Sequence, residues 1–152
     1  MKRRLVLSAA AAGAAALSLP ARAQGPRPRV QAYKSSTCGC CGDWVDHLEA
    51  AGFAVKVIEV DDTSATRRHL GMPAAFGSCH TALVDGYVLE GHVPAAAVKR
   101  LLAARPRALG LAVPGMPVGS PGMETGSHSD AFDVLLIDKT GRASVFAHHP
   151  RT

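Results

Sequence analysis

The sequence predicts one mixed α/β domain in which strands and helices alternate before a hairpin closes the chain. Short runs of β-branched residues alternate with apolar patterns of helical period, and Gly and Pro mark the boundaries between them. A chain of 152 residues with 47% hydrophobic side chains can bury one modest core. Only 5% of the residues are aromatic and 19% are charged, which argues against a large base-stacking surface.

Residues 1–23 are predicted to be an export signal. A basic start at Lys2 to Arg4 precedes an apolar run that ends at Pro20. Ala21-Arg22-Ala23 then offers a cleavage site. The apolar run of about fifteen residues is shorter than the roughly 20 that span a bilayer. We therefore expect a periplasmic protein with no membrane span in the mature form, exported by general secretion or by the twin-arginine route.

Most of the excess basic charge belongs to this signal. The formal net charge is +5, but four of the 17 Lys and Arg residues and none of the 12 acidic residues lie in residues 1–23. The remainder therefore carries a net charge of about +1, which gives no reason to expect a nucleic-acid partner.

The domain itself is expected at 30–152, after a flexible Pro-containing leader at 24–29. The predicted strands are rich in β-branched or apolar residues and cover 30–34, 54–60, 81–84, 87–89, 132–137 and 143–146. Asp85-Gly86 and the segment 138–141 are turn sequences that join the last four of these strands into two hairpins.

Three helices are expected between the strands. They carry apolar residues at helical spacing and cover 43–51, 63–70 and 94–105. Asp43 is expected to be the N-cap or a first-turn acid of the first helix, and Gly52 ends it. Asp61-Asp62 is expected to cap the second helix, and Pro94 to open the third. The segment 110–126, rich in Pro and Gly, is expected to form a long loop without regular structure.

Cys38 and Cys41 lie two residues apart between the first strand and the first helix, which is the layout of a thioredoxin-like site. The amides and dipole at a helix N-terminus stabilise a thiolate, which both attacks disulfides and binds metal. The pair alone is therefore compatible with a metal site, a structural disulfide or redox catalysis. Cys40 favours the metal site, because a third thiol would compete with a simple dithiol exchange.

Cys79 directly precedes the third predicted strand, where thioredoxin-like proteins place a cis-proline over the cysteine pair. The sequence Ser78-Cys79-His80-Thr81 has no proline there. We therefore expect Cys79 and His80 to face the Cys38–Cys41 loop. In an exported protein with four cysteines, a second disulfide between Cys40 and Cys79 is the alternative, and His80 is then a hydrogen-bonded loop histidine.

Met116 and Met123 lie in the Pro- and Gly-rich segment, within Pro114-Gly115-Met116-Pro117 and Pro121-Gly122-Met123-Glu124. Uncharged thioethers suit Cu(I), a soft ion, better than zinc. Ordinary packing is the alternative role for both. Of the other histidines, His47 is expected on the solvated side of the first helix and His92 in a structural position.

From about Val30 to Phe146 the chain resembles a family of small periplasmic metal-binding proteins, catalogued as a domain of unknown function and associated with copper resistance. The stretches that carry the resemblance are Cys38-Gly39-Cys40-Cys41, Ser78 to Ala82, Tyr87 to Pro94, Gly110 to Pro117 and Gly119 to Glu124. The resemblance implies a thioredoxin-like domain that binds copper, and it implies no known reaction.

The sequence therefore predicts a periplasmic Cu(I)-binding protein, not an enzyme, that sequesters or relays copper, with zinc as the alternative ion. The candidate metal ligands are Cys38, Cys40, Cys41 and Cys79, with His80, Met116 and Met123 as completing groups. Other periplasmic copper-handling proteins are the candidate partners. The rival function is a thiol-disulfide oxidoreductase that uses the Cys38/Cys41 pair. A zinc-stabilised structural module is a third alternative.

Overall fold

The computed structural model describes residues 25–152, so the predicted export signal lies outside the described part. Within this part, every helix is too short or too polar to span a bilayer. The chain enters through residues 25–28, which are exposed and have no regular structure, in the region of the predicted flexible leader.

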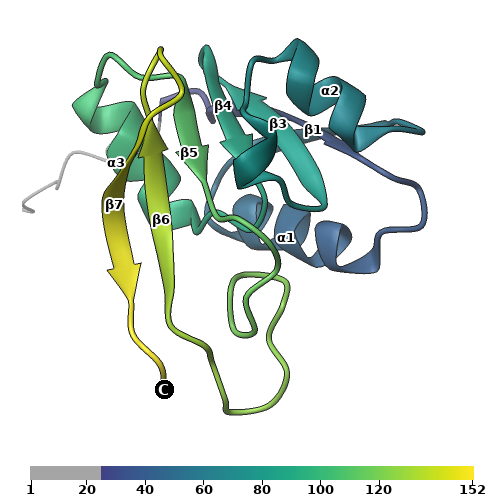
Figure 1. Cartoon of the computed structure of the whole chain (residues 1–152). Helices are drawn as coiled ribbons and strands as arrows, with labels where there is room; N and C mark the ends of the chain where they lie inside the picture. The colour runs from purple at the N-terminus through teal and green to yellow at the C-terminus, as the bar shows by residue number, and fades with distance from the viewer. Residues whose placement is uncertain (1–24) are drawn as a thin grey trace, which may run out of the picture.

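Seven strands form one mixed sheet in the order β2-β1-β3-β4-β5-β6-β7 (Figure 1). The strands are β1 Arg29–Lys34, β2 Ala54–Glu59, β3 His80–Val84, β4 Tyr87–Glu90, β5 Gly110–Ala112, β6 Phe132–Ile137 and β7 Ala143–His149. β1 pairs with β2 in parallel and with β3 antiparallel, and β4 pairs in parallel with β5. This sheet with flanking helices confirms the predicted thioredoxin-like α/β class.

The helices cover both faces of the sheet and are α1 Gly39–Ala50, α2 Thr63–His69 and α3 Ala95–Ala104, with a short 3₁₀ turn η1 at Ala74–Phe76. One core contains Trp44 and Leu48 of α1, Leu101 of α3 and alternate strand residues such as Ala82. Because neighbouring strand residues point to opposite faces, Leu83 contributes to a second core beneath α2 and η1. The α1 face holds the larger core.

Two details of the predicted elements are wrong. The first helix begins at Gly39 with Cys38 as its N-cap, not at Asp43, so Cys40 and Cys41 lie in its first turn. The segment 110–126 does contain regular structure, because Gly110–Ala112 forms β5. A Cβ at Gly110 would lie 1.7 Å from the Val88 carbonyl oxygen, so a glycine is needed where β5 meets β4.

The other predicted helix ends and both hairpins are confirmed. Asp62 caps α2, because its Oδ1 accepts from the amides of Ser64 and Ala65 over 2.8 and 3.1 Å. Pro94 is the N-cap of α3, and Gly52 follows α1 with a φ of 95°. The C-terminal hairpin is longer than predicted, since β7 continues to His149.

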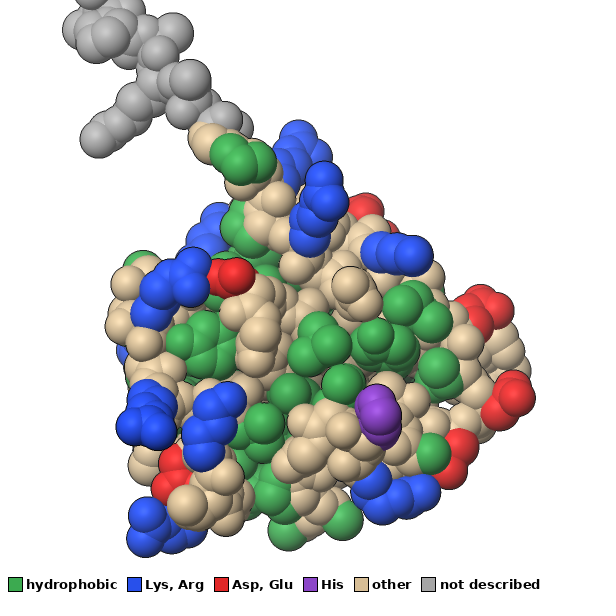
Figure 2. All heavy atoms as spheres, turned by 90° about the horizontal axis from the view of Figure 1, so that it is seen from above, with side chains coloured by type: hydrophobic (Ala, Val, Ile, Leu, Met, Phe, Trp, Pro, Cys, Tyr) green, Lys and Arg blue, Asp and Glu red, His purple; other side chains and the backbone are tan. Residues whose placement is uncertain are grey.

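The face of the molecule seen from above carries side chains of every class (Figure 2). Lys and Arg side chains are spread around its rim, with acidic side chains among them, and apolar side chains occupy its middle. The positive charge is therefore not gathered into one basic surface on this face.

Candidate metal centre

Three cysteines occupy the N-terminus of α1. Cys38 and Cys41 form a disulfide, and the Sγ atoms of Cys38 and Cys40 are 3.6 Å apart. Cys41 is buried, whereas Cys38 and Cys40 are half-buried. Unpaired helix amides surround this first turn, and no acidic side chain lies in it. The turn therefore favours a negatively charged sulfur.

The strand register brings Cys79 to the same place. β3 runs antiparallel to β1, and His80 is paired with Lys34 at the end of β1. Cys79, which precedes β3, therefore lies beside the loop that leads into α1. The ligand atoms of Cys38, Cys40, Cys41 and Cys79 all lie within 4.8 Å of one another, and Cys79 is a free thiol, like Cys40. Cys79 therefore faces the N-terminal cysteines, as the sequence predicts.

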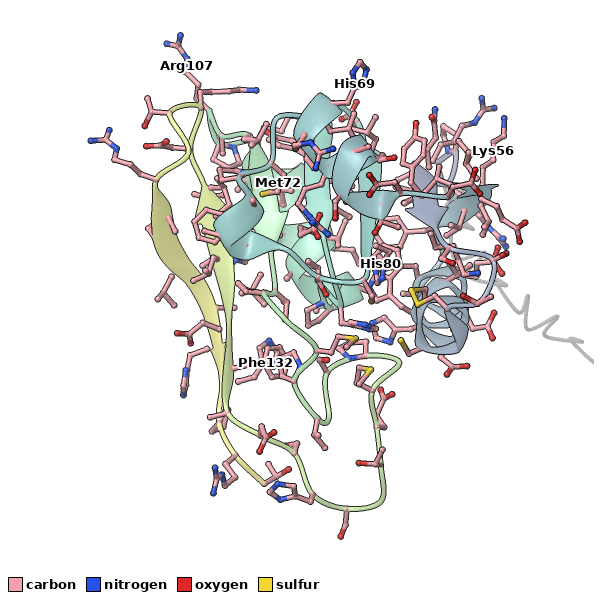
Figure 3. The ribbon with its side chains drawn as sticks, turned by 45° about the vertical axis from the view of Figure 1, so that its right-hand side comes forward. Lys56, His69, Met72, His80, Arg107 and Phe132 are labelled. Carbon is pink, nitrogen blue, oxygen red and sulfur yellow. A yellow bond between two sulfur atoms is a disulfide. The ribbon has the colours of Figure 1, made fainter. Side chains whose placement is uncertain are left out.

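Two imidazoles flank Cys79. Its Sγ is 3.2 Å from His80 Nδ1 and 3.1 Å from His92 Nε2, and the three ligand atoms form a second group within 4.8 Å. Figure 3 shows His80 at this end of the sheet, near the disulfide. His80 Nε2 is buried and has no hydrogen-bond partner within the described structure.

His92 is the site residue that the sequence interpretation missed. It was expected to be structural, but it is fully buried at the site, and its Nδ1 lies 2.8 Å from the carbonyl oxygen of Pro121. The hairpin offered a signal: Thr81 and Glu90 are register partners, so residues 79 and 92, each two positions beyond that pair, lie at the same end of the hairpin. His92 thus joins the cysteine group to the 113–126 loop.

Burial controls the protonation of this group. It raises the pKa of Cys79 to about 11, with the nearby Cys40 sulfur acting in the same direction. It lowers the pKa of His80 to about 3, and His92 adds to this effect. Burial also lowers the pKa of His92. At neutral pH the metal-free site therefore holds a Cys79 thiol and neutral imidazoles, and a neutral imidazole nitrogen is free to accept a metal.

The 113–126 loop lies against the cysteine-bearing helix. A Cβ at Gly122 would lie 2.7 Å from both the Cys40 carbonyl oxygen and the Trp44 amide nitrogen, so the loop backbone approaches α1 as closely as a glycine permits. Near its other end, Gly115 donates to the Gly77 carbonyl oxygen over 3.1 Å. Met123 follows Gly122 and is half-buried, whereas Met116 is 52% exposed. Both methionines remain candidate ligands.

His47 is more enclosed than expected. It lies on α1 but is half-buried, and its Nε2 accepts from the Ala95 amide over 3.0 Å at the start of α3. Trp44 makes a parallel link, because its indole nitrogen donates to the Val93 carbonyl oxygen over 2.9 Å. These contacts fix the 93–95 segment, and with it His92, against α1.

The donor set fits a soft metal ion. Four sulfurs and two imidazoles converge, and no carboxylate belongs to either of the two groups of potential ligands in residues 25–152. Thiolates select Cu(I) and zinc, whereas carboxylate-poor sites disfavour magnesium and calcium. The Cys38–Cys41 disulfide offers a second chemistry at the same position, thiol-disulfide exchange.

Comparison with known proteins gives a consistent result. Residues 76–123 match the family model described as "Protein of unknown function, DUF411". Two solved structures described as copper resistance protein copG are each 47% identical to the chain over 82% of its length. Form 2 is covered completely with a TM-score of 0.79, and form 1 over 99% of its length with a TM-score of 0.78. No curated protein matches the chain.

Proposed function

This chain belongs to the copper-resistance-associated DUF411 family, and on that premise we propose that it binds Cu(I) in the periplasm. The protein would sequester the ion or transfer it to other periplasmic copper-handling proteins. Neither role requires turnover, so the proposal is a binding protein and not an enzyme.

The observation that carries this proposal is the convergence of four cysteine sulfurs within 4.8 Å from two distant parts of the sequence. Cys38, Cys40, Cys41 and Cys79 are the proposed ligands. Thiolates are soft donors that suit Cu(I), and the absence of carboxylates among these grouped donors supports a soft ion. His80, Met116 and Met123 are proposed to complete the site, and the position of His92 adds it to this set.

Binding through all four sulfurs requires that a two-electron reductant, such as a dithiol, first convert the Cys38–Cys41 disulfide into two thiols. The disulfide form and the fully ligated form therefore exclude each other. A copper-loaded protein is expected to hold no disulfide, and loss of copper in the oxidising periplasm favours its return.

The disulfide also supports a second candidate function, a thiol-disulfide oxidoreductase. Cys38 is the half-buried N-cap of α1 and would be the attacking thiol, with the buried Cys41 as resolver. This function predicts a Cys38 pKa well below the unperturbed ~8.5 and reduction of a model disulfide. Inertness in that assay would favour a binding protein over the oxidoreductase. If zinc instead serves as a structural ion, chelation unfolds the domain.

The proposed function is tested with the reduced mature protein. Competition titration should show that it binds Cu(I) far more tightly than Zn(II). Cys38→Ser and Cys79→Ser should each weaken Cu(I) binding by about 100-fold or more, which exceeds the loss typical of changing a residue that only contacts a ligand. Ser36→Ala, an exposed change in the same loop, is the control. Unchanged Cu(I) affinity in both cysteine variants would refute the proposal.

A further inference from the structure

We propose that the buried ion pair of Arg67 and Glu90 positions Cys79 for ligation, an inference that rests on the proposed metal-binding function. The pair joins α2 to the end of β4, and Arg67 Nε donates to Glu90 Oε1 over 2.7 Å. Their side chains are 8% and 0% exposed, whereas the other ion pairs of residues 25–152 lie at the surface.

The carboxylate of Glu90 holds the residues on both sides of the Cys79-His80 dipeptide. Its Oε1 accepts from the Ser78 amide over 2.7 Å, and its Oε2 accepts from the Thr81 hydroxyl over 2.6 Å. Cys79 and His80 are therefore bracketed by two hydrogen bonds to one buried carboxylate. Hydrogen bonds to a charged acceptor are about twice as strong as neutral ones.

The guanidinium of Arg67 also holds Ser78, so Arg67 and Glu90 together form a clamp on the residue before Cys79. While its Nε contacts Glu90, its Nη2 donates to the Ser78 carbonyl oxygen over 2.5 Å. Ser78 is thus held at its amide by Glu90 and at its carbonyl by Arg67. A planar guanidinium can contact both acceptors in a fixed arrangement, which a lysine ammonium cannot do.

Two glycines show how closely the clamp fits the loop before Cys79. A Cβ at Gly77 would lie 3.0 Å from Arg67 Nη1, so the loop backbone packs on the guanidinium. A Cβ at Gly91 would lie 2.6 Å from Ser78 Cβ and 2.5 Å from the Val113 carbonyl oxygen. The loop before Cys79 is therefore enclosed by α2 on one side and by the residue after β4 on the other.

The chemistry of the pair favours positioning over stability. Burying an ion pair costs desolvation energy that its attraction often fails to recover, and well-packed apolar residues serve stability equally well. A sulfur ligand, in contrast, must be held to within about 0.5 Å of a productive position. Arg67 and Glu90 touch no sulfur in the contacts described and act through the backbone of Ser78, so they are positioning residues.

The test measures sulfur positions in two ways, one of them without copper. Phenylarsine oxide bridges two thiols that lie close together, and with the Cys38–Cys41 disulfide intact its targets are Cys40 and Cys79. In Glu90→Gln and Arg67→Lys, bridging by this arsenical should slow by at least about 10-fold, and Cu(I) affinity of the reduced protein should fall by about 10- to 100-fold. Asp85→Asn, which breaks the exposed pair with Arg105, is the matched control.

Thermal unfolding of the metal-free variants separates positioning from folding. If Glu90→Gln is too unstable to study, Thr81→Val removes one hydrogen bond to the same carboxylate with little change in shape, and it should slow bridging severalfold in a folded protein. The inference would be overturned if every folded variant of Arg67, Glu90 or Thr81 were bridged at the wild-type rate. It would also be overturned if bridging slowed only as far as the unfolded fraction of each variant explains. If the wild type bridges quickly but binds Cu(I) poorly, the proposed function fails while the positioning role stands.

Discussion

The two sides of the candidate copper site are built differently. On the cysteine side, a helix N-terminus and the register between β1 and β3 bring four sulfurs within 4.8 Å, and buried side chains hold the last of them. On the loop side, residues 113–126 are anchored through their own main chain, partly by the His92 side chain, and Met116 remains 52% exposed. If the site binds copper as proposed, the difference means that the thiols are already gathered before the ion arrives, whereas the thioethers would come from a more accessible segment.

The largest expected effect is loss of a cysteine. Cys40→Ser removes the thiol that lies between the disulfide partners in the sequence. Cu(I) affinity should fall by about 100-fold or more, a larger loss than is usual for a residue that only contacts a metal ligand. Competition with a coloured Cu(I) chelator measures this change, with the reduced wild type as reference. An affinity within error of the wild type would show that the cysteine side does not bind through Cys40.

A change that lifts the loop should have the next largest effect. Gly122 has a φ of 83°, and a Cβ there would lie 2.7 Å from two backbone atoms of α1. Gly122→Ala should therefore destabilise the protein by about 1–3 kcal/mol, as overpacking does. Urea denaturation measures the loss, and Gly126→Ala, where a Cβ meets open space at a similar φ of 71°, is the control. Equal stability of the two variants would contradict the close seat of the loop.

Acidification should destabilise the metal-free protein. Burial lowers the pKa of His80 to about 3 and also lowers the pKa values of His47 and His92. The unfolded chain binds these protons below about pH 6.5 and the folded chain resists them, so the free energy of unfolding falls as pH drops. The lowered pKa of His80 alone should reduce the free energy of unfolding by about 2 kcal/mol at about pH 5. Glu90, whose pKa burial raises, acts in the opposite direction.

Urea denaturation of the metal-free protein at about pH 7.5 and about pH 5 tests this linkage. A lower stability at the acidic pH agrees with buried neutral histidines on the cysteine side. A free energy of unfolding that does not fall at the acidic pH would mean that the buried histidines do not outweigh the opposite contribution of Glu90.

The smallest expected effects belong to the thioethers. Met123 is half-buried beside Gly122, so Met123→Leu should weaken Cu(I) binding severalfold through loss of a soft donor. Met116→Leu should have a smaller effect, because Met116 is 52% exposed. The same chelator competition compares both variants. A Met116 effect as large as that of Cys40→Ser would remove the distinction between the two sides.

Sequence patterns predicted the fold class and the cysteine side because these depend on short-range signals. The Asp85-Gly86 turn, the helical spacing after Cys38 and the Cys79-His80 dipeptide are all local features. His92 was missed because its role comes from the hairpin register, which places it beside Cys79 across the end of β3 and β4. The helix start at Gly39 was missed because Cys38 caps it without a side-chain hydrogen bond.

Arg67 and Glu90 could not be found from local patterns. In the sequence, Arg67 is one of several basic residues near the end of a short helix, and Glu90 directly follows the predicted strand 87–89. Only the packing of α2 over β3 and β4 buries both side chains and turns them toward Ser78. Such long-range contacts leave little signal in a single sequence.

Metal analysis of the protein isolated from its native compartment, with free-thiol counting on the same sample, tests the central claim most directly. Copper bound to the protein, with four alkylatable thiols after its removal by a chelator under anaerobic conditions, is the predicted result. Copper-loaded protein that still holds the Cys38–Cys41 disulfide, with only two alkylatable thiols after the copper is removed, would contradict copper binding through all four cysteines.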